Sequence, residues 1–292
     1  MKKIALYTFL IFTIYLNGQK IELVESFIGY TNKSEIISFT KNPKLIMSGN
    51  YQGGINLWNL EKQSLLKKIN AHTAPISHIT FHDSKNTFLS ASKDSTIKLW
   101  SFYSHRLIDS IKINNTPTIV MFNNKGNDYF ICTEEGLILE KKTLRKTPEI
   151  ITNTETAISD AFFDAETNKI ITCDQNSIKI ISSNTGEILN EIRNPYSSYF
   201  VKVNSYSNDT IISWSENGII SYWDLNNKSL ISEIRAKNAY NKLLMNNYSE
   251  TILSGYYNDR PLVINLQEIE INQKYSKNMI VVNTFLSSLD QK

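Results

Sequence analysis

The sequence has few of the cysteines that cross-link small proteins and few of the prolines and glycines that are frequent in linkers between domains. Its 292 residues include 2 cysteines, 6 prolines and 10 glycines, and no Pro-, Ser- or Gly-rich linker interrupts it. So few cysteines exclude a disulfide scaffold, and the missing linkers favour a single unit. Hydrophobic residues make up 41% of the chain, which is enough for a substantial core.

An excess of charge of one sign is also missing. The chain carries 31 Lys and Arg against 28 Asp and Glu, and its formal net charge is +3. A nearly neutral chain gives no electrostatic drive toward nucleic acid or anionic lipid. We therefore expect no nucleic acid among its partners, and no membrane beyond the N-terminal segment.

Motifs for catalysis or for metal binding are lacking. The sequence holds no Ser-His-Asp order, no Gly-rich phosphate loop and no CxxC pair, and Asn258-Asp259 has no third acidic neighbour for calcium. His72, His78 and His82 lie close together, but His78 stands in the middle of the apolar strand pattern ISHITF. We expect no catalytic residue, no cofactor and no metal, and a protein that is not an enzyme.

The N-terminal segment is of a different kind from the rest of the chain. Two lysines precede an apolar run from Ile4 to Leu16, and the run ends at Gly18. This is the layout of a secretory signal peptide, and the run is shorter than the about twenty residues of a membrane span. The sequence predicts a signal peptide over 1–18, a mature chain over 19–292 and a periplasmic or secreted protein. An uncleaved membrane anchor is the alternative, because Leu16 is a poor match to the small residue favoured before a cleavage site.

One stretch reads as two strands of an antiparallel sheet. FLSASKDSTIKLW begins at Phe88 with an apolar, β-branched half, turns at a polar Lys-Asp pair and ends in an alternating half. The stretch resembles the WD-repeat family, whose signature residues match His72, Ser90, Asp94 and Trp100 here. The resemblance implies that these four side chains form a hydrogen-bonded ladder across one blade of a β-propeller. That role is structural rather than catalytic.

The pattern recurs at a fixed period, which identifies a repeat protein. Positions equivalent to Trp100 follow one another at intervals of 40 to 42 residues. The apolar residue that ends each first strand recurs at the same intervals and counts seven repeats. The first series comprises Trp58, Trp100, Lys141, Ile181, Trp223 and Ile264, and the second comprises Phe39, Phe81, Phe122, Phe163, Val203, Met245 and Phe285.

The two series differ by one repeat, and the difference lies at the chain ends. The seventh repeat begins near Met279, and Lys292 is reached before its second and third strands. Ile21 to Phe27 aligns with the fourth strand of a blade, and in the family such an N-terminal strand closes the ring as the outer strand of the last blade. We therefore expect an all-β β-propeller of four-stranded blades, with six complete blades and an incomplete seventh.

The incomplete seventh blade has three explanations. The chain is the N-terminal part of a longer protein, the last blade is degenerate, or a partner donates strands to the open edge. We favour the first, in which about thirty further residues would complete the ring.

The polar ladder is unevenly kept among the repeats. The blade of Trp100 has all four members, whereas Lys141, Ile181 and Ile264 replace the Trp outright. We therefore expect an intact ladder in one blade, with only the apolar packing kept in the other five. The alignment assigns the Asp94 position in those blades to Gln52, Glu135, Gln175, Asn217 and Asn258.

Cys132 and Cys173 fall at the same place in adjacent blades. Neighbouring sheets pack about 10 Å apart, whereas a disulfide needs Cα atoms about 6 Å apart. The sequence therefore predicts two buried free thiols.

What remains for function is surface. In WD-repeat proteins the turns between second and third strands, with the loops that lead into each first strand, usually receive partners. The resemblance implies a non-enzymatic scaffold for protein–protein interaction, a protein partner that the sequence does not identify, and a monomer. The alternative is a small-molecule-binding or hydrolytic propeller enzyme that uses the central channel.

The candidate residues of the partner face include one that is out of pattern. Trp214 stands where the family has a small residue, so it either fills a gap between blades, which we favour, or protrudes into this face. Tyr199 comes from a loop that leads into a first strand. The candidate partner face comprises Tyr51, Lys93, Glu134, Tyr196, Trp214, Glu216 and Tyr257.

Overall fold

The chain folds into β-strands joined by short turns. Within the described residues of this computed structural model, the strands form five four-stranded antiparallel sheets, one three-stranded sheet and one two-stranded sheet. The predicted all-β class is confirmed. The structure describes residues 8–13, 22–28, 34–42, 44–59, 62, 64–82, 84–123, 128–195, 198–207, 209–217, 219–235, 244–246, 251–257 and 260–265.

Each four-stranded sheet takes its strands in chain order. The first sheet comprises β3 (Ser34–Phe39), β4 (Leu45–Asn50), β5 (Gly54–Asn59) and β6 (Ser64–Asn70); the second comprises β7 (Ile76–His82), β8 (Thr87–Ser92), β9 (Thr96–Ser101) and β10 (Leu107–Lys112); the third comprises β11 (Pro117–Phe122), β12 (Tyr129–Thr133), β13 (Leu137–Lys141) and β14 (Glu149–Asn153). The fourth comprises β15 (Asp160–Asp164), β16 (Lys169–Cys173), β17 (Ser177–Ser182) and β18 (Ile188–Arg193), and the fifth comprises β19 (Phe200–Ser207), β20 (Thr210–Ser215), β21 (Ile219–Asp224) and β22 (Ser229–Arg235). The smaller sheets are β23 (Leu244–Asn246), β24 (Thr251–Tyr257) and β25 (Arg260–Asn265), and β1 (Thr8–Thr13) with β2 (Glu22–Ile28).

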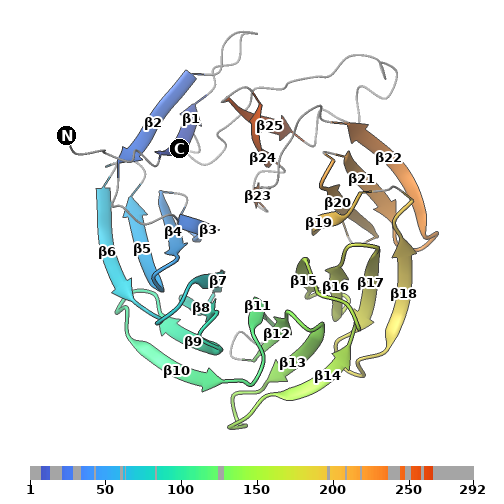
Figure 1. Ribbon diagram of the computed structural model, residues 1–292, viewed down its shortest axis with the longest axis horizontal. Helices are drawn as coiled ribbons and strands as arrows, with labels where there is room; N and C mark the ends of the chain where they lie inside the picture. Colours follow the sequence, from blue (N-terminus) through green and yellow to red (C-terminus); the bar gives the residue numbers. More distant parts are fainter. Residues whose placement is uncertain are drawn as a thin grey trace.

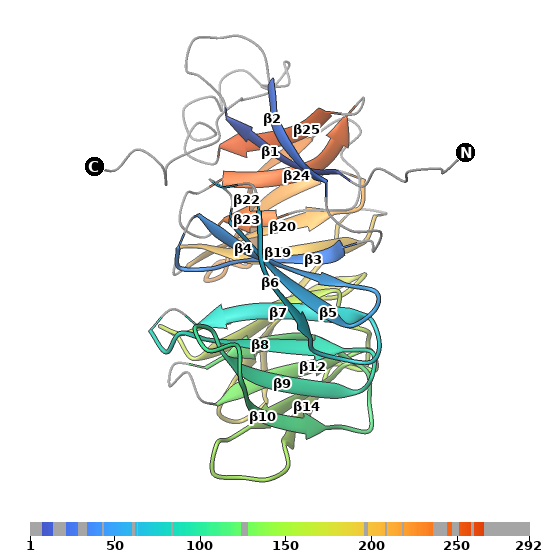
Figure 2. The ribbon, with the colours of Figure 1, turned by 90° about the vertical axis from the view of Figure 1, so that its left-hand side faces the viewer.

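The sheets stand around a common axis and form a ring (Figure 1). The first strands, β3, β7, β11, β15, β19 and β23, lie nearest the centre, and the fourth strands lie on the periphery. Seen from the side, the strands run across the thickness of the ring, so their ends lie on two opposite faces (Figure 2). This is a β-propeller, and each four-stranded sheet is one blade. We call the face that carries residues 51–53, 93–95, 134–136, 174–176 and 216–217, the turns between second and third strands, the turn face.

The blades are held together by apolar side chains that pack between neighbouring sheets. Successive side chains of a strand point to opposite sides, so each central strand serves both the preceding and the following blade. One cluster joins Leu89, Ile97 and Ile111 of the second blade to Val120 and Ile131 of the third. Two more clusters join the third blade to the fourth and the fourth to the fifth. The core is therefore divided into layers between blades, as in other proteins built from stacked repeats.

The two ends of the ring are described in part. β2 lies on the periphery beside the first blade (Figure 1), where the alignment of residues 21–27 predicts an outer strand. It pairs with β1, which falls inside the segment predicted to be a signal peptide, and cleavage of that segment stays a prediction. The fourth strand of the sixth blade and the seventh repeat from Met279 onward lie outside the described residues.

Both cysteines are free and buried, so the prediction of two free thiols is confirmed. Cys132 belongs to the cluster between the third and fourth blades, and Cys173 belongs to the cluster between the fourth and fifth. Burial raises the pKa of both thiols above its ordinary value, which keeps them protonated at neutral pH.

Candidate functional site

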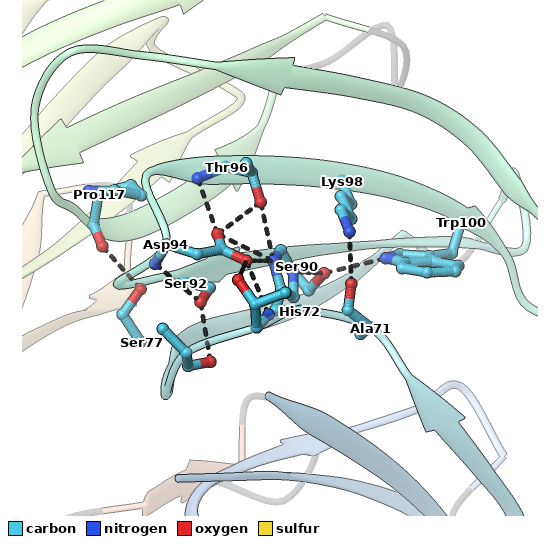
Figure 3. A network of polar contacts seen from close by, with 12 residues as sticks. Ala71, His72, Ser77, Ser90, Ser92, Asp94, Thr96, Lys98, Trp100 and Pro117 are labelled. Atoms are coloured by element: carbon cyan, nitrogen blue, oxygen red, sulfur yellow. Dashed lines mark hydrogen bonds and ion pairs between the residues drawn. The ribbon is translucent and has the colours of Figure 1, made fainter. Parts of the chain in front are cut away.

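A chain of hydrogen bonds crosses the second blade from its Trp to its Asp (Figure 3). Trp100 Nε1 lies 2.9 Å from Ser90 Oγ, and Ser90 Oγ lies 2.7 Å from His72 Nε2. An indole N–H can only donate, so Ser90 accepts from Trp100 and directs its own hydrogen to Nε2. The proton of the neutral imidazole is then on Nδ1, 3.2 and 3.1 Å from the two carboxylate oxygens of Asp94. The four residues selected from the sequence form one directed ladder.

The ladder holds His72 in its neutral form. Burial lowers the pKa of this side chain, the Asp94 carboxylate opposes that effect, and the resulting pKa is about 4. A second proton would have to enter at Nε2, where it would displace the hydrogen bond from Ser90. At neutral pH the imidazole therefore links Ser90 to Asp94 and fixes their positions. Both of its nitrogens are hydrogen-bonded, so neither is free to act as a base.

Asp94 anchors the turn between β8 and β9. Its carboxylate accepts hydrogen bonds from the backbone N–H of Thr96 and of Thr73, both at 3.0 Å, and from the Thr96 hydroxyl at 2.6 Å. Partial burial works to raise the pKa of Asp94, but these hydrogen bonds and the neighbouring His72 outweigh it and lower the pKa to about 2. The carboxylate is fully engaged in holding the turn.

Half of the ladder survives in two further blades. Trp58 Nε1 donates to Ser48 Oγ at 2.9 Å, and Trp223 Nε1 donates to Ser213 Oγ at 2.8 Å. Both pairs keep the ten-residue spacing of the second blade. The prediction that one blade alone keeps ladder bonds is therefore wrong for the bond between Trp and Ser. These two residues lie on paired strands, so they meet even in blades that lack the His and the Asp.

The fourth blade replaces the ladder with a buried ion pair. Lys179 Nζ lies 3.0 Å from Asp174 Oδ2 and donates to the carbonyl of Thr154 at 2.9 Å. Asp174 also accepts from the backbone N–H groups of Asn176 and Ser177, both at 2.7 Å. Only 4% of Asp174 and 9% of Lys179 is exposed. Asp174 thus anchors the turn between the second and third strands of this blade, as Asp94 does in the second blade.

Sequence alignment missed this pair because it assigns the Asp94 position to Gln175, which is exposed. Counted between the last paired residues, the second blade has five residues, 92–96, between Ala91 and Ile97, whereas the fourth has four, 174–177, between Cys173 and Ile178, and Asp174 is the first of them. A signal for the lysine was present in the shared motif of Thr96-Ile-Lys98 and Ser177-Ile-Lys179. Lys98 likewise donates to a carbonyl of the segment that precedes the first strand, that of Ala71, at 2.5 Å.

Lys141 takes the Trp position of the third blade. It is 3% exposed, and its Nζ lies 3.3 Å from Asp109 Oδ2 on β10. It also donates to the carbonyl of Lys142 at 3.1 Å. Asp109 belongs to the second blade. Lys in place of Trp therefore replaces the Trp–Ser hydrogen bond within one blade by an ion pair between two blades.

The turns of the turn face are fixed by backbone hydrogen bonds that repeat from blade to blade. The N–H groups of Lys93, Glu134 and Glu216 donate to carbonyls of the loop that leads into the first strand of the same blade, at 2.8 to 3.0 Å. The carbonyls of Gly53 and Gly136, both with positive φ, accept from the segment that leads into the following blade. The turns of the second and third blades are tied on both sides, since the Ser95 carbonyl likewise accepts from the Ile113 N–H, and the turns of Gly53 and Glu216 are each tied on one side.

The structure brings most of the candidate partner residues to the turn face. Lys93, Glu134 and Glu216 are exposed, as are Tyr51 at 46% and Tyr199 at 49%. Tyr196 lies outside the described residues. Tyr257 is the last residue of β24, and its side chain lies outside the described part of the structure.

Trp214 does not belong to this face, and its place among the candidate partner residues was wrong. It is 2% exposed. It lies on β20 three residues after Ile211, which packs between the fourth and fifth blades. Alternation along the strand points Trp214 to the other side of the sheet, toward the sixth blade. The large side chain fills space between blades, which was the favoured of the two expectations.

Three of the four histidines take part in hydrogen bonds of their own. His72 belongs to the ladder, His78 accepts from the backbone N–H of Val120 at 3.5 Å, and His82 Nδ1 lies 3.4 Å from Ser84 Oγ. Across the described ranges, no group of three or more His, Cys, Asp or Glu is placed to hold a metal ion. Nor do these ranges contain a helix with the length and apolar character needed to span a membrane.

Known proteins share parts of this sequence. Residues 63–101 match the family model described as WD domain, G-beta repeat. The chain is 33% identical over 81 residues to the WD repeat domain-containing protein 83 homolog of Dictyostelium discoideum, which covers 27% of this chain and 25% of that protein. It is 24% identical over 205 residues to the p21-activated protein kinase-interacting protein 1-like of Gallus gallus, which covers 66% of this chain and 54% of that protein. The matched stretches span a quarter to about half the length of these relatives.

A solved structure shares the fold. The computationally designed Ika8 protein superposes with a TM-score of 0.64 at 18% identity, covering 83% of this chain and 74% of that one. At this identity the likeness concerns architecture alone. Residues 63–101 are a WD repeat, and the ring of four-stranded blades, the polar ladder of the second blade and the matching relatives make the chain similar to WD-repeat β-propellers.

Proposed function

We propose that the chain is a non-enzymatic platform that binds a protein partner on its turn face. The observation that carries the proposal is a set of exposed side chains on tied turns and loops: Tyr51, Lys93, Glu134, Tyr199 and Glu216. A surface that is ordered before binding loses little conformational entropy when a partner docks. Tyrosine adds a large contact area and a hydroxyl, which is why it is frequent among residues that dominate binding energy.

The relatives support an interaction role. The name of the Gallus gallus protein refers to interaction with a p21-activated protein kinase. We carry over from it only the general class of function, binding to another protein, because about half of that relative is matched.

The rim of the ring is less suited to a partner than the turn face. Register shifts leave one bulge in the outer strand of each four-stranded blade, at Leu66, Ile108, Ile151, Leu189 and Ile231. A bulge bends an edge strand and hinders the addition of a further strand. This favours the turn face as the docking surface.

Replacing both exposed tyrosines of the turn face tests the proposal. The partner is first recovered by affinity purification with the full chain and identified by mass spectrometry. We expect the double variant Tyr51→Ala, Tyr199→Ala to bind it at least tenfold more weakly, because each tyrosine contributes about 1 kcal/mol or more at such a surface. Affinity is measured by calorimetry with purified proteins.

Two controls separate binding from folding. Tyr103→Ala removes a tyrosine that is 74% exposed in the turn after β9, at the opposite end of the blade, and is expected to leave the affinity unchanged. His72→Ala is expected to lower the free energy of unfolding by about 1 to 3 kcal/mol, since Ser90 and Asp94 lose a buried partner, without weakening binding. Binding that survives the double variant, or that is lost in a folded His72→Ala protein, would contradict the proposal.

We also propose that the chain is exported to the periplasm or secreted after cleavage behind Gly18. The two N-terminal lysines and the apolar run that follows support this. When the full chain is expressed in a bacterium with a periplasm, N-terminal sequencing of the exported protein is expected to begin at Gln19. Leu10→Arg interrupts the apolar run and is expected to leave an uncleaved chain inside the cell. Unchanged export of that variant, or a wild-type chain that stays in the cytoplasm with Met1 in place, would refute export through this segment.

A further inference from the structure

Three ionisable side chains stand at one level of the innermost strands. His78 on β7, Asp160 on β15 and Lys202 on β19 each pair with the same position of the second strand in their blades. Ile36 and Ile119 hold that position in the first and third blades. The innermost strands surround the axis of the ring (Figure 1), so these residues form one layer around the axis.

Asp160 and Lys202 form an ion pair between the fourth and fifth blades. Lys202 Nζ lies 3.0 Å from Asp160 Oδ1, and the Val203 N–H donates to Oδ2 at 3.2 Å. The Asp160 carboxylate raises the pKa of Lys202, so the ammonium is charged at neutral pH. The side chain of Lys202 is 40% exposed, whereas that of Asp160 is 13% exposed. Lys202 therefore keeps part of its side chain accessible to solvent, whereas the carboxylate of its partner is largely buried.

His78 adds another donor to the same layer. The Val120 N–H can only donate, so Nδ1 accepts from it, and the proton of the neutral imidazole lies on Nε2. Burial lowers the pKa of His78, and the charge of Lys202 lowers it further, to about 3. His78 is thus a neutral donor at pH 7, at the same level of the innermost strands as Lys202.

We propose that this layer binds a small oxyanion, the phosphate or carboxylate group of a free small molecule, between the Lys202 ammonium and the Nε2–H of His78. Ammonium and imidazole N–H groups are the donors that an oxyanion requires, and hydrogen bonds between charged groups are the stronger kind. The ion pair with Asp160 uses one of the three donors of the Lys202 ammonium, which leaves the layer with donors to offer. The site uses none of the side chains proposed to bind the partner, so loss of anion binding and loss of partner binding are measured separately.

Side-chain NMR of the histidines tests the site, because the chain has only 4 of them. The full chain is titrated at pH 7 with inorganic phosphate and, separately, with acetate. We expect a saturable shift of the His78 Nε2 resonance, with the His72 and His105 resonances unchanged. We also expect the pKa of His78 to rise in the presence of the anion, because a nearby negative charge favours imidazolium. Tighter binding of phosphate would assign a phosphoryl ligand, and tighter binding of acetate would assign a carboxylate.

Three substitutions give opposite expectations. Lys202→Met removes the ammonium and is expected to weaken binding at least tenfold. Asp160→Asn keeps an acceptor for the Val203 N–H but frees the ammonium from its carboxylate, and is expected to tighten binding several-fold. Lys112→Met removes the same charge from an exposed position of the outer strand β10, as a matched control, and is expected to leave anion binding unchanged.

The proposal fails if neither anion shifts His78, or if the shift persists in full with Lys202→Met. A purely structural ion pair would not produce tighter anion binding in Asp160→Asn. If Lys202→Met does not fold because Asp160 loses its cation, the double variant Asp160→Asn, Lys202→Met removes both charges together. It carries the same expectation of at least tenfold weaker binding.

Discussion

Asp174→Ala is expected to lower the free energy of unfolding by about 3 to 5 kcal/mol, the usual cost of removing one partner of a buried ion pair. The substitution leaves the Lys179 ammonium, in a residue that is 9% exposed, without its carboxylate. It also removes the acceptor of the Asn176 and Ser177 N–H groups, which hold the turn between β16 and β17. Urea unfolding of the full chain, followed by tryptophan fluorescence, measures the effect.

Matched variants in the same turn separate charge from turn geometry. Asp174→Asn keeps an oxygen for the two backbone N–H groups and loses only the charge, so a smaller loss is expected. Gln175→Ala changes the exposed neighbour that alignment placed at the Asp94 position, and its effect is expected within about 0.5 kcal/mol of zero. If Asp174→Ala cost no more than Gln175→Ala, the fourth blade would not depend on this ion pair.

The ring itself could be predicted from the sequence because its cause is periodic. Two independent series of apolar positions recur every 40 to 42 residues, and each marks a strand that the structure contains in the first five blades. Packing between blades favours an apolar residue at those positions. Ile181 replaces Trp without loss of the strand, and Lys141 replaces it with an ion pair to Asp109. The period therefore survives where the polar signature has decayed.

The polar contacts could not be predicted in the same way, because each depends on the length of a turn or on a neighbouring blade. Asp174 acts one residue earlier than alignment expects, since its turn is shorter. Lys141 finds its partner Asp109 in the preceding blade, a relation with no fixed spacing in the repeat. The burial of Trp214 likewise depends on which side of β20 it occupies, and only the packing of Ile211 decides that.

Acidification is expected to destabilise the ring well before its carboxylates titrate. The pKa of His72 falls from an ordinary 6.5 to about 4, and that of His78 falls to about 3, in both cases chiefly because of burial. Between these values and pH 6.5 the unfolded chain binds more protons than the folded one, so stability falls as the pH falls. The contribution is complete above pH 6.5, and by pH 4.5 the loss amounts to roughly 2 to 3 kcal/mol for each histidine. The pKa of Asp94 is lowered to about 2, so its contribution is lost only below the ordinary value of 3.8 and does not enter this window.

Urea unfolding at pH 7.5, 6.0 and 4.5, in buffers free of phosphate and carboxylate, measures this dependence. Those anions are avoided because an ion beside His78 would raise its pKa and hide part of the effect. His72→Gln and His78→Gln cannot titrate, so each is expected to be less stable at pH 7.5 and yet to lose roughly 2 to 3 kcal/mol less than the wild type on going to pH 4.5. Because the two side chains lie in different contacts, the ladder and the innermost layer, the double variant is expected to remove both contributions additively. Equal stability of the wild type at pH 7.5 and pH 4.5 would mean that neither imidazole is held neutral by the fold. If His72→Gln lost as much stability as the wild type between these pH values, the burial of His72 in the ladder would not be a cause of the pH dependence.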